Sequence, residues 1–131
     1  MGALREHAES LTVASRGAFT VQVHGEAGPT PLPAAIELAA YRVAMEAMTN
    51  AAVHSRAGRC DVEVVVNGHG LRVEVSDDGI GLAAANGARR GSGMGLRSIA
   101  DRADELGGTS DVESSADGTR VRLCLPLEVA P

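Results

Sequence analysis

The chain has 131 residues, a formal net charge of −5, and 44% apolar but only 2% aromatic residues. This length predicts one domain, with a core built from aliphatic side chains. The negative charge and the scarcity of aromatic rings argue against nucleic acid as a partner, because nucleic-acid sites use basic surfaces and stacking rings. No segment has the pattern of a membrane span, a signal peptide or a basic amphipathic helix, so we expect no direct membrane contact by this domain.

The two cysteines, Cys60 and Cys124, are far apart in the sequence and lack the spacing of metal ligands. We therefore expect two reduced, structural thiols rather than a disulfide or a metal site. Such thiols are typical of cytosolic proteins, so this usage favours a cytoplasmic location.

The first part of the chain is expected to form a short helix and a strand. Apolar residues recur at a helical spacing between Leu4 and Thr12, and a turn follows. Between Ala18 and His24, apolar and polar residues alternate, which predicts a half-buried strand. The Gly- and Pro-rich stretch 25–33 then predicts a loop.

A long helix is predicted from Pro33, which suits the first helical position, to a stop at Gly58. Within it, Glu46, Asn50 and His54 are spaced i, i+4 and i+8, so they lie along one face. The other faces are mostly apolar, so this polar stripe is set into a buried helix. A buried Glu or Asn needs partners, which are either protein groups or a bound ligand with its metal.

The remaining chain is expected to form two hairpins separated by a helix. The first hairpin pairs 62–66 with 71–76, and the second pairs 109–114 with 119–127 and buries Val121, Leu123 and Leu125. The helix 96–106 has a regular apolar period and stops at two glycines. Together these elements predict an α/β sandwich, with one sheet and helices on one face.

A glycine motif, Asp77-x-Gly79-x-Gly81, directly follows the first hairpin. Its glycines allow a sharp turn and a close approach of the backbone to a flat ligand. Asp77 would then accept a hydrogen bond from an exocyclic amine, such as that of adenine. An ordinary turn at the end of a strand is the alternative interpretation.

A second glycine motif, Gly91-x-Gly93-x-Gly95, opens the helix at Leu96. Free N–H groups and the positive end of the helix dipole make this position suitable for a phosphate. The preceding stretch 82–92 has no apolar period, so we interpret it as a mobile loop.

The order of these motifs resembles the ATP-binding domain of the GHKL ATPases. The segments LPAAIELAAYRVAMEAMTNAAVHS, VSDDGIGL, GMGLRSIADRADELGG and GTRVRLCLP are similar to the catalytic domain of bacterial two-component sensor histidine kinases, especially the nitrate-sensor-like subfamily with a short ATP lid. The resemblance covers Ala18 to Pro126. It implies a two-layer α/β sandwich with a mixed, mostly antiparallel sheet. It also implies that 1–17 is a helical linker from an upstream dimerisation domain and that 18–131 is the ATP-binding domain.

The resemblance further implies ATP and Mg²⁺ as cofactors. Asn50 would coordinate Mg²⁺ through its amide oxygen, a suitable hard ligand. Glu46 would orient a water or the attacking group, and His54 would line the phosphate end, although His54 could instead cap the helix. The lid hinge and the phosphate cradle would be formed by Gly93, Gly95 and Leu96.

The same resemblance assigns Asp77 to the adenine amine. Gly79 and Gly81 would shape the adenine pocket. Thr119 would support the hydrogen bonds on this side, with a purely structural strand residue as the alternative.

The implied function is that of a histidine kinase: binding Mg–ATP and donating the γ-phosphate to a histidine on an adjacent dimerisation domain, from which it passes to a response regulator. In this family the acceptor histidine is usually followed by an acidic residue, and none of the four histidines of this chain fits that motif. We therefore expect an ATP site without its acceptor, and no autophosphorylation by the isolated chain. The domain would be cytoplasmic, either alone or as the cytosolic part of a membrane-bound sensor. An anti-sigma-type serine kinase and a degenerate nucleotide-sensing module are the alternatives.

Overall fold

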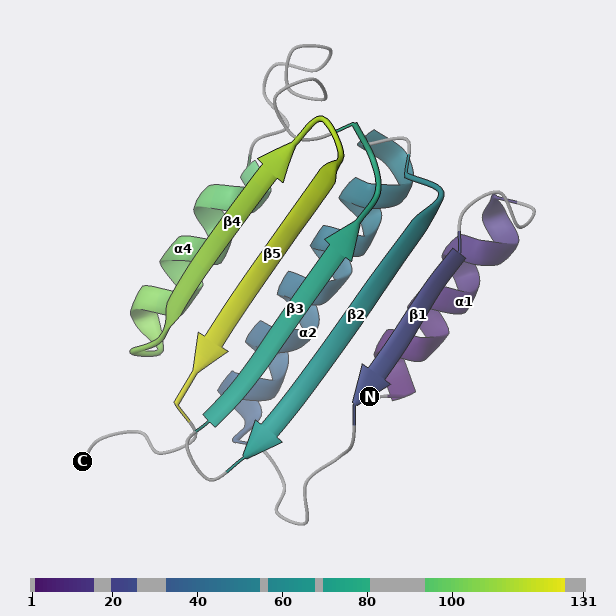
Figure 1. Cartoon of the computed structure of the whole chain (residues 1–131). Helices are drawn as coiled ribbons and strands as arrows, with labels where there is room; N and C mark the ends of the chain where they lie inside the picture. The colour runs from purple at the N-terminus through teal and green to yellow at the C-terminus, as the bar shows by residue number, and fades with distance from the viewer. Residues whose placement is uncertain are drawn as a thin grey trace.

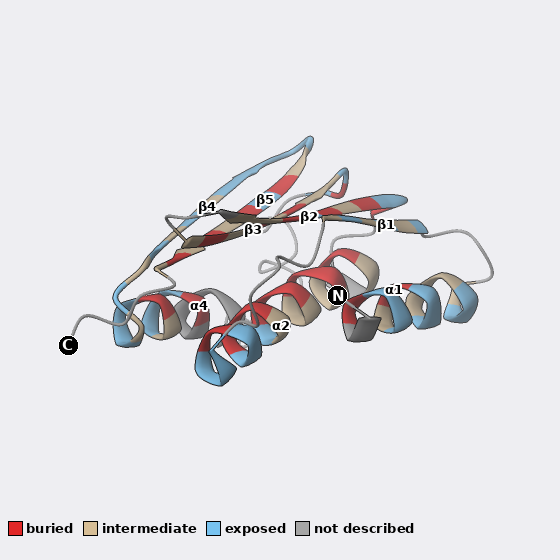
Figure 2. Ribbon diagram, turned by 90° about the horizontal axis from the view of Figure 1, so that it is seen from below, coloured by how far each residue is buried: buried red, intermediate tan, exposed pale blue. Residues whose placement is uncertain are grey.

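The structure of the chain, a computed structural model, describes residues 2–15, 20–25, 33–54, 57–67, 70–80 and 94–126. These residues form a two-layer α/β sandwich, in which one sheet is covered by helices on a single face (Figures 1 and 2). The elements follow in the order α1 (Gly2–Ala14), β1 (Thr20–Gly25), α2 (Ala34–Thr49), the π-helix η1 (Asn50–His54), β2 (Arg59–Asn67), β3 (Gly70–Asp77), α4 (Met94–Glu105), β4 (Thr109–Ser115) and β5 (Gly118–Leu125). The predicted fold class is confirmed.

The five-stranded sheet has the order β1-β2-β3-β5-β4 (Figure 1). β1 pairs with β2 in parallel, and the other neighbouring strands are antiparallel. Both predicted hairpins are therefore confirmed, as β2–β3 and β4–β5. The alternation of apolar and polar residues predicted these strands correctly, because one face of each strand is buried and the other faces solvent.

The core lies between the sheet and the helices (Figure 2). Three side chains of β5 were predicted to be buried, and they are: Val121, Leu123 and Leu125 are 6%, 0% and 2% exposed. They share one core cluster with inward residues of β2 and β3, and with Ile36 and Met48 of α2. Each buried aliphatic side chain of this kind contributes about 1.5–3 kcal/mol to folding.

Helix α1 packs on the same core, beside β1 and α2. Leu4 and Ala8 are 6% and 5% exposed and belong to the core cluster. His7 Nε2 lies 3.3 Å from Thr49 Oγ1, so a polar contact also joins α1 to the end of α2. The predicted helix is confirmed, whereas its role as a linker from an upstream dimerisation domain stays a prediction. Among the described helices, none has the length and apolar character needed to cross a bilayer.

The long helix departs from the prediction at both ends. Pro33 was expected at the first helical position but is the N-cap, with φ −55° and ψ 140°, and the helix begins at Ala34. At Asn50 the regular α-helix gives way to the π-helix η1, which ends at His54. The apolar period does not distinguish a π-turn from an α-turn, because it reports only which side is buried.

The face of the sheet that points away from the helices carries several ion pairs between neighbouring strands. Glu74, whose side chain is 19% exposed, lies 3.2 Å from Arg122 Nε and 3.4 Å from Arg120 Nε. Arg72 bonds Glu63 at 2.7 Å on the neighbouring strand. These pairs join neighbouring strands across the face that the helices leave open, and opposite charges on adjacent strands stabilise the sheet.

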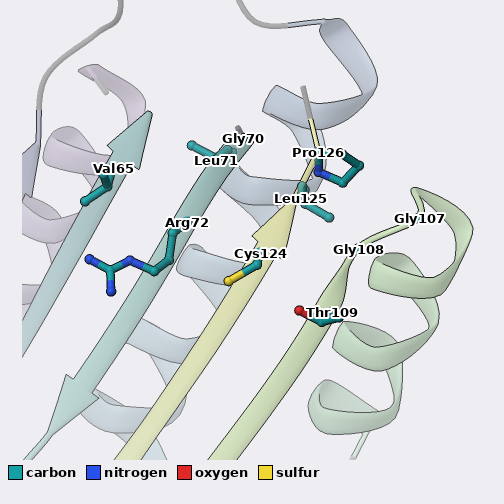
Figure 3. Close-up of a pocket in the computed structure, with 10 residues that line it drawn as sticks. All are labelled: Val65, Gly70, Leu71, Arg72, Gly107, Gly108, Thr109, Cys124, Leu125 and Pro126. Carbon is teal, nitrogen blue, oxygen red and sulfur yellow. The ribbon is translucent and has the colours of Figure 1, made fainter. Parts of the chain in front are cut away.

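A hollow of about 560 Å³ lies at the end of the sheet where β5 finishes (Figure 3). Figure 3 shows Cys124 and Thr109 side by side on the paired strands β5 and β4, with Leu125 and Pro126 beyond them. None of the described residues that line this hollow was predicted from the sequence to be functional. The candidate site therefore lies elsewhere.

Candidate functional site

Those predicted functional residues that the structure describes gather at the other end of the sandwich. This end holds the C-terminus of β3, the turn between β4 and β5, the η1 end of the long helix and the start of α4 (Figure 1). Elements that are far apart in the sequence thus bring their polar groups to one edge. Such an edge is where α/β layers commonly place ligands.

Asp77 ends β3 and is half-buried, between Cys60 of β2 and Thr119 of β5 in the sheet register. Its Oδ1 accepts a hydrogen bond from the backbone N–H of Gly79 at 2.8 Å. This bond folds the chain sharply after the strand, and Gly79 itself is buried. The carboxylate is therefore held in one orientation at the mouth of the site.

Burial raises the pKa of the Asp77 carboxyl above its ordinary value, the N–H groups of Gly79 and Thr119 lower it, and the charge of Asp78 raises it. The increase wins because removing a carboxylate from water costs more than two backbone hydrogen bonds return. A carboxylate in this environment gains from any ligand that offers it an N–H donor. Its surroundings therefore suit recognition of an amine.

Thr119 is buried at 7% exposure, and its Oγ1 lies 3.1 Å from Ser114 Oγ. Gly118 precedes it at φ 144°, and a Cβ atom there would overlap the carbonyl oxygen of Asp77. The turn between β4 and β5 thus lies in close contact with the end of β3. A hollow of about 300 Å³ opens here, lined by Asp77, Ser114, Gly118 and Thr119 among others.

Asn50 and Glu46 lie one turn apart near the end of the long helix, and both are partly buried. Asn50 is where the α-helix changes to η1, and its backbone N–H reaches both Ala47 O and Glu46 O. π-helical turns are frequent at functional sites because they re-aim side chains. His54 ends η1, but its side chain lies outside the described part, so the predicted stripe is confirmed only for Glu46 and Asn50.

Helix α4 begins at Met94, so Gly95 and Leu96 lie in its first turn, as the sequence predicted. Their backbone positions agree with a phosphate site at a helix N-terminus. Gly81, Gly93 and the proposed lid 82–92 lie outside the described residues. Their predicted roles stay predictions.

The floor of the site contains Cys60, which is fully buried opposite Asp77. Burial and neighbouring carboxylates, of which Asp77 acts most strongly, raise the pKa of this thiol to about 12. Cys60 and Cys124 are both free thiols, as predicted. Cys60 is therefore a protonated packing residue and not a nucleophile.

Asp78 follows Asp77 directly and was not predicted from the sequence to be functional. Its Oδ1 accepts hydrogen bonds from the backbone N–H groups of Gly58 at 2.8 Å and Arg59 at 2.9 Å. The doubled acidic residue before the glycine was a visible signal. Its partners lie about 20 residues earlier in the chain, so only the fold could identify them.

Among the described residues, no group of three or more His, Cys, Asp or Glu side chains could hold a metal by itself. Mg²⁺ is often bound by one or two protein oxygens together with phosphate oxygens and water. The partly buried amide of Asn50 fits that kind of site. These residues are thus compatible with a metal that arrives with a phosphate ligand.

A family model described as histidine kinase-, DNA gyrase B- and HSP90-like ATPase matches residues 35–129, which include every predicted site residue. The chain belongs to this ATPase family. The oxygen sensor histidine kinase NreB of Staphylococcus carnosus is 33% identical over 70% of this chain and 26% of its own length. The sensor histidine kinase LiaS of Bacillus subtilis is 27% identical over 95% of the chain and 34% of its own length.

A solved histidine kinase domain, from the blue-light activated histidine kinase of Erythrobacter litoralis, has a TM-score of 0.72 and 26% identity, covering 95% of this chain and 63% of that one. Together these similarities identify the chain as a catalytic ATP-binding domain of the sensor histidine kinase type. The chain spans about a quarter to a third of the two curated relatives.

Proposed function

We propose that the chain binds Mg–ATP at the edge formed by Asp77 and Asn50 and donates the γ-phosphate to a histidine on an adjacent dimerisation domain. A response regulator then receives the phosphate. The names of NreB and LiaS, both sensor histidine kinases, favour this function over the anti-sigma-type serine kinase. The nitrate-sensor-like subfamily and a cytoplasmic location belong to the same proposal.

The observation that carries the proposal is the orientation of Asp77. Its carboxylate accepts the Gly79 N–H through Oδ1 and lies beside Thr119 in the sheet register, and the two oxygens of a carboxylate have enough lone pairs to accept an amine hydrogen bond as well. An adenine amine is such a donor, whereas the guanine carbonyl at the same ring position is not. Gly79 and Gly81 let the base approach the backbone.

The phosphate end would use the long helix and α4. Asn50 would hold Mg²⁺ through its amide oxygen, and the bound ion neutralises charge on the phosphates. The N–H groups in the first turn of α4, at Gly95 and Leu96, would bind phosphate oxygens, with Gly93 as a hinge. Glu46 would orient the attacking group, and His54 would line the phosphates.

Phosphoryl transfer depends mainly on holding the attacking atom in line with the γ-phosphate. The protein therefore contributes position and charge, while the attacking imidazole comes from the partner domain. A sharp test is to mix the chain and radiolabelled ATP with the cognate dimerisation domain. Label on that domain, lost with Asn50→Ala, supports the proposal, and transfer unaffected by Asn50→Ala contradicts it.

A further inference from the structure

Asp78 joins two segments that the proposed nucleotide site needs at a fixed separation. Its carboxylate accepts the N–H groups of Gly58 and Arg59, at 2.8 and 2.9 Å, on a single oxygen. Its own N–H donates to Arg59 O at 3.3 Å. We call these three hydrogen bonds the Asp78 clamp. The clamp begins where the β2–β3 ladder ends, at the pair Cys60 and Asp77.

Further hydrogen bonds connect the clamp to the proposed phosphate end of the site at Asn50 and to the proposed adenine end at Asp77. On one side, Ala57 N–H donates to Ala51 O at 3.2 Å, and Ala51 follows Asn50 directly in η1. On the other side, Asp77 precedes Asp78, and its carboxylate accepts the Gly79 N–H. A nearly continuous path of hydrogen bonds thus runs from the helix end of Asn50 to the turn of Asp77.

We propose that Asp78 is a positioning residue, whose clamp sets the distance between the phosphate end of the site at Asn50 and the adenine end at Asp77. This inference rests on the proposed function. A ligand that contacts both ends gains its affinity from simultaneous engagement, which requires the correct separation. A ligand that contacts one end does not depend on that separation.

Asp78 is exposed at the surface, so its role differs from that of a core residue. The charge of Asp78 also raises the pKa of Asp77, so removing that charge favours the carboxylate form of Asp77. Electrostatics alone therefore predicts that binding at the adenine end is kept or improved without Asp78. A loss of ATP affinity in such a variant points to geometry.

The test compares Asp78→Ala, Asp78→Asn and the matched control Asp111→Ala, which removes an exposed carboxylate from β4. Three probes are titrated into each folded protein and followed by NMR chemical shifts: Mg–ATP for both ends, adenosine for one, and Mg–tripolyphosphate for the other. We expect Asp78→Ala to weaken Mg–ATP about tenfold and to change the single-end probes less than about twofold, because a small misplacement costs only the ligand that spans both ends.

Asp78→Asn keeps an oxygen acceptor without the charge, so we expect a loss of about threefold for Mg–ATP, and Asp111→Ala should match the wild type. If Asp78→Ala does not fold, the same comparison rests on Asp78→Asn. Equal weakening of ATP and adenosine, or unchanged ATP affinity, would overturn the clamp. A wild-type chain that binds no ATP would instead overturn the proposed function itself.

Discussion

Gly118 approaches Asp77 so closely that a Cβ atom at this position would overlap the carbonyl oxygen of Asp77. The close approach brings the turn between β4 and β5 against the end of β3, where the adenine site is proposed. Gly118 also adopts φ 144°, which L side chains rarely reach. The shape of this edge therefore depends on one glycine.

Gly118→Ala should lower the free energy of unfolding by about 2–4 kcal/mol, because it combines an unfavourable φ with a backbone overlap. Gly107→Ala is the matched control: its φ is 74°, but the nearest atom to a Cβ is Pro126 Cγ at 3.9 Å. That variant should lose only about 1 kcal/mol. Denaturant unfolding of both checks this, and equal losses would show that the close approach has no cost.

Asp77→Asn should weaken recognition of adenine more than recognition of the triphosphate. The variant exchanges a carboxylate acceptor for an amide, and losing the charge-assisted bond should cost about 1.5–3 kcal/mol. The informative quantity is the ratio of ATP to GTP affinity, measured in both proteins. A ratio that does not change would remove Asp77 from the adenine site.

Asp77→Asn should also gain stability relative to the wild type as the pH rises, although it weakens the recognition of adenine. The pKa of Asp77 is raised in the folded chain, so above the ordinary pKa the folded state binds more protons than the unfolded state. The free energy of unfolding contributed by this group therefore falls as pH rises through the raised pKa. Asp77→Asn lacks this loss and can still accept the Gly79 N–H.

We therefore expect the stability of Asp77→Asn relative to the wild type to increase as pH rises from acidic to neutral. Urea unfolding of both proteins at several pH values measures this difference. A difference that is constant with pH would show that the folded Asp77 carboxyl titrates as it does in the unfolded chain.

The two thiols should differ strongly in reactivity. Cys60 is 0% exposed with a pKa of about 12, whereas Cys124 is only partly buried on the open face. Alkylation by iodoacetamide requires an accessible thiolate, so Cys124 should react while Cys60 stays protected until the chain unfolds. Peptide mapping after short labelling distinguishes the two, and equal labelling would contradict the packing around Cys60.

The sequence predicted the elements well because their patterns are local. Apolar alternation identified both hairpins, and the stripe of Glu46 and Asn50 marked the helix on which the phosphate end of the site is proposed. What it missed depends on tertiary contacts. The Asp78 clamp, the approach of Gly118 to Asp77 and the π-turn at Asn50 involve partners or helix geometry that no periodicity encodes.

The isolated chain should bind ATP without phosphorylating itself. No histidine of the chain fits the acceptor motif, and Nε2 of His7 in α1 lies at hydrogen-bond distance, 3.3 Å, from Thr49 Oγ1 at the end of α2. Transfer requires an attacking atom in line with the γ-phosphate. Incubation with radiolabelled ATP should leave the chain unlabelled. A covalent label that persists until acid removes it would show that one of the chain's own histidines is the acceptor.

Asn50 and Asp77 are proposed to form the two ends of one Mg–ATP site, and calorimetric titration of ATP with and without Mg²⁺ measures whether both ends take part in binding. We expect the wild type to bind ATP more tightly with Mg²⁺ than without it. In Asn50→Ala this enhancement should disappear, while Asp77→Asn should weaken ATP but keep the enhancement. No binding heat at millimolar ATP, or a Mg²⁺ enhancement that survives Asn50→Ala unchanged, would show that the two residues do not form one Mg–ATP site.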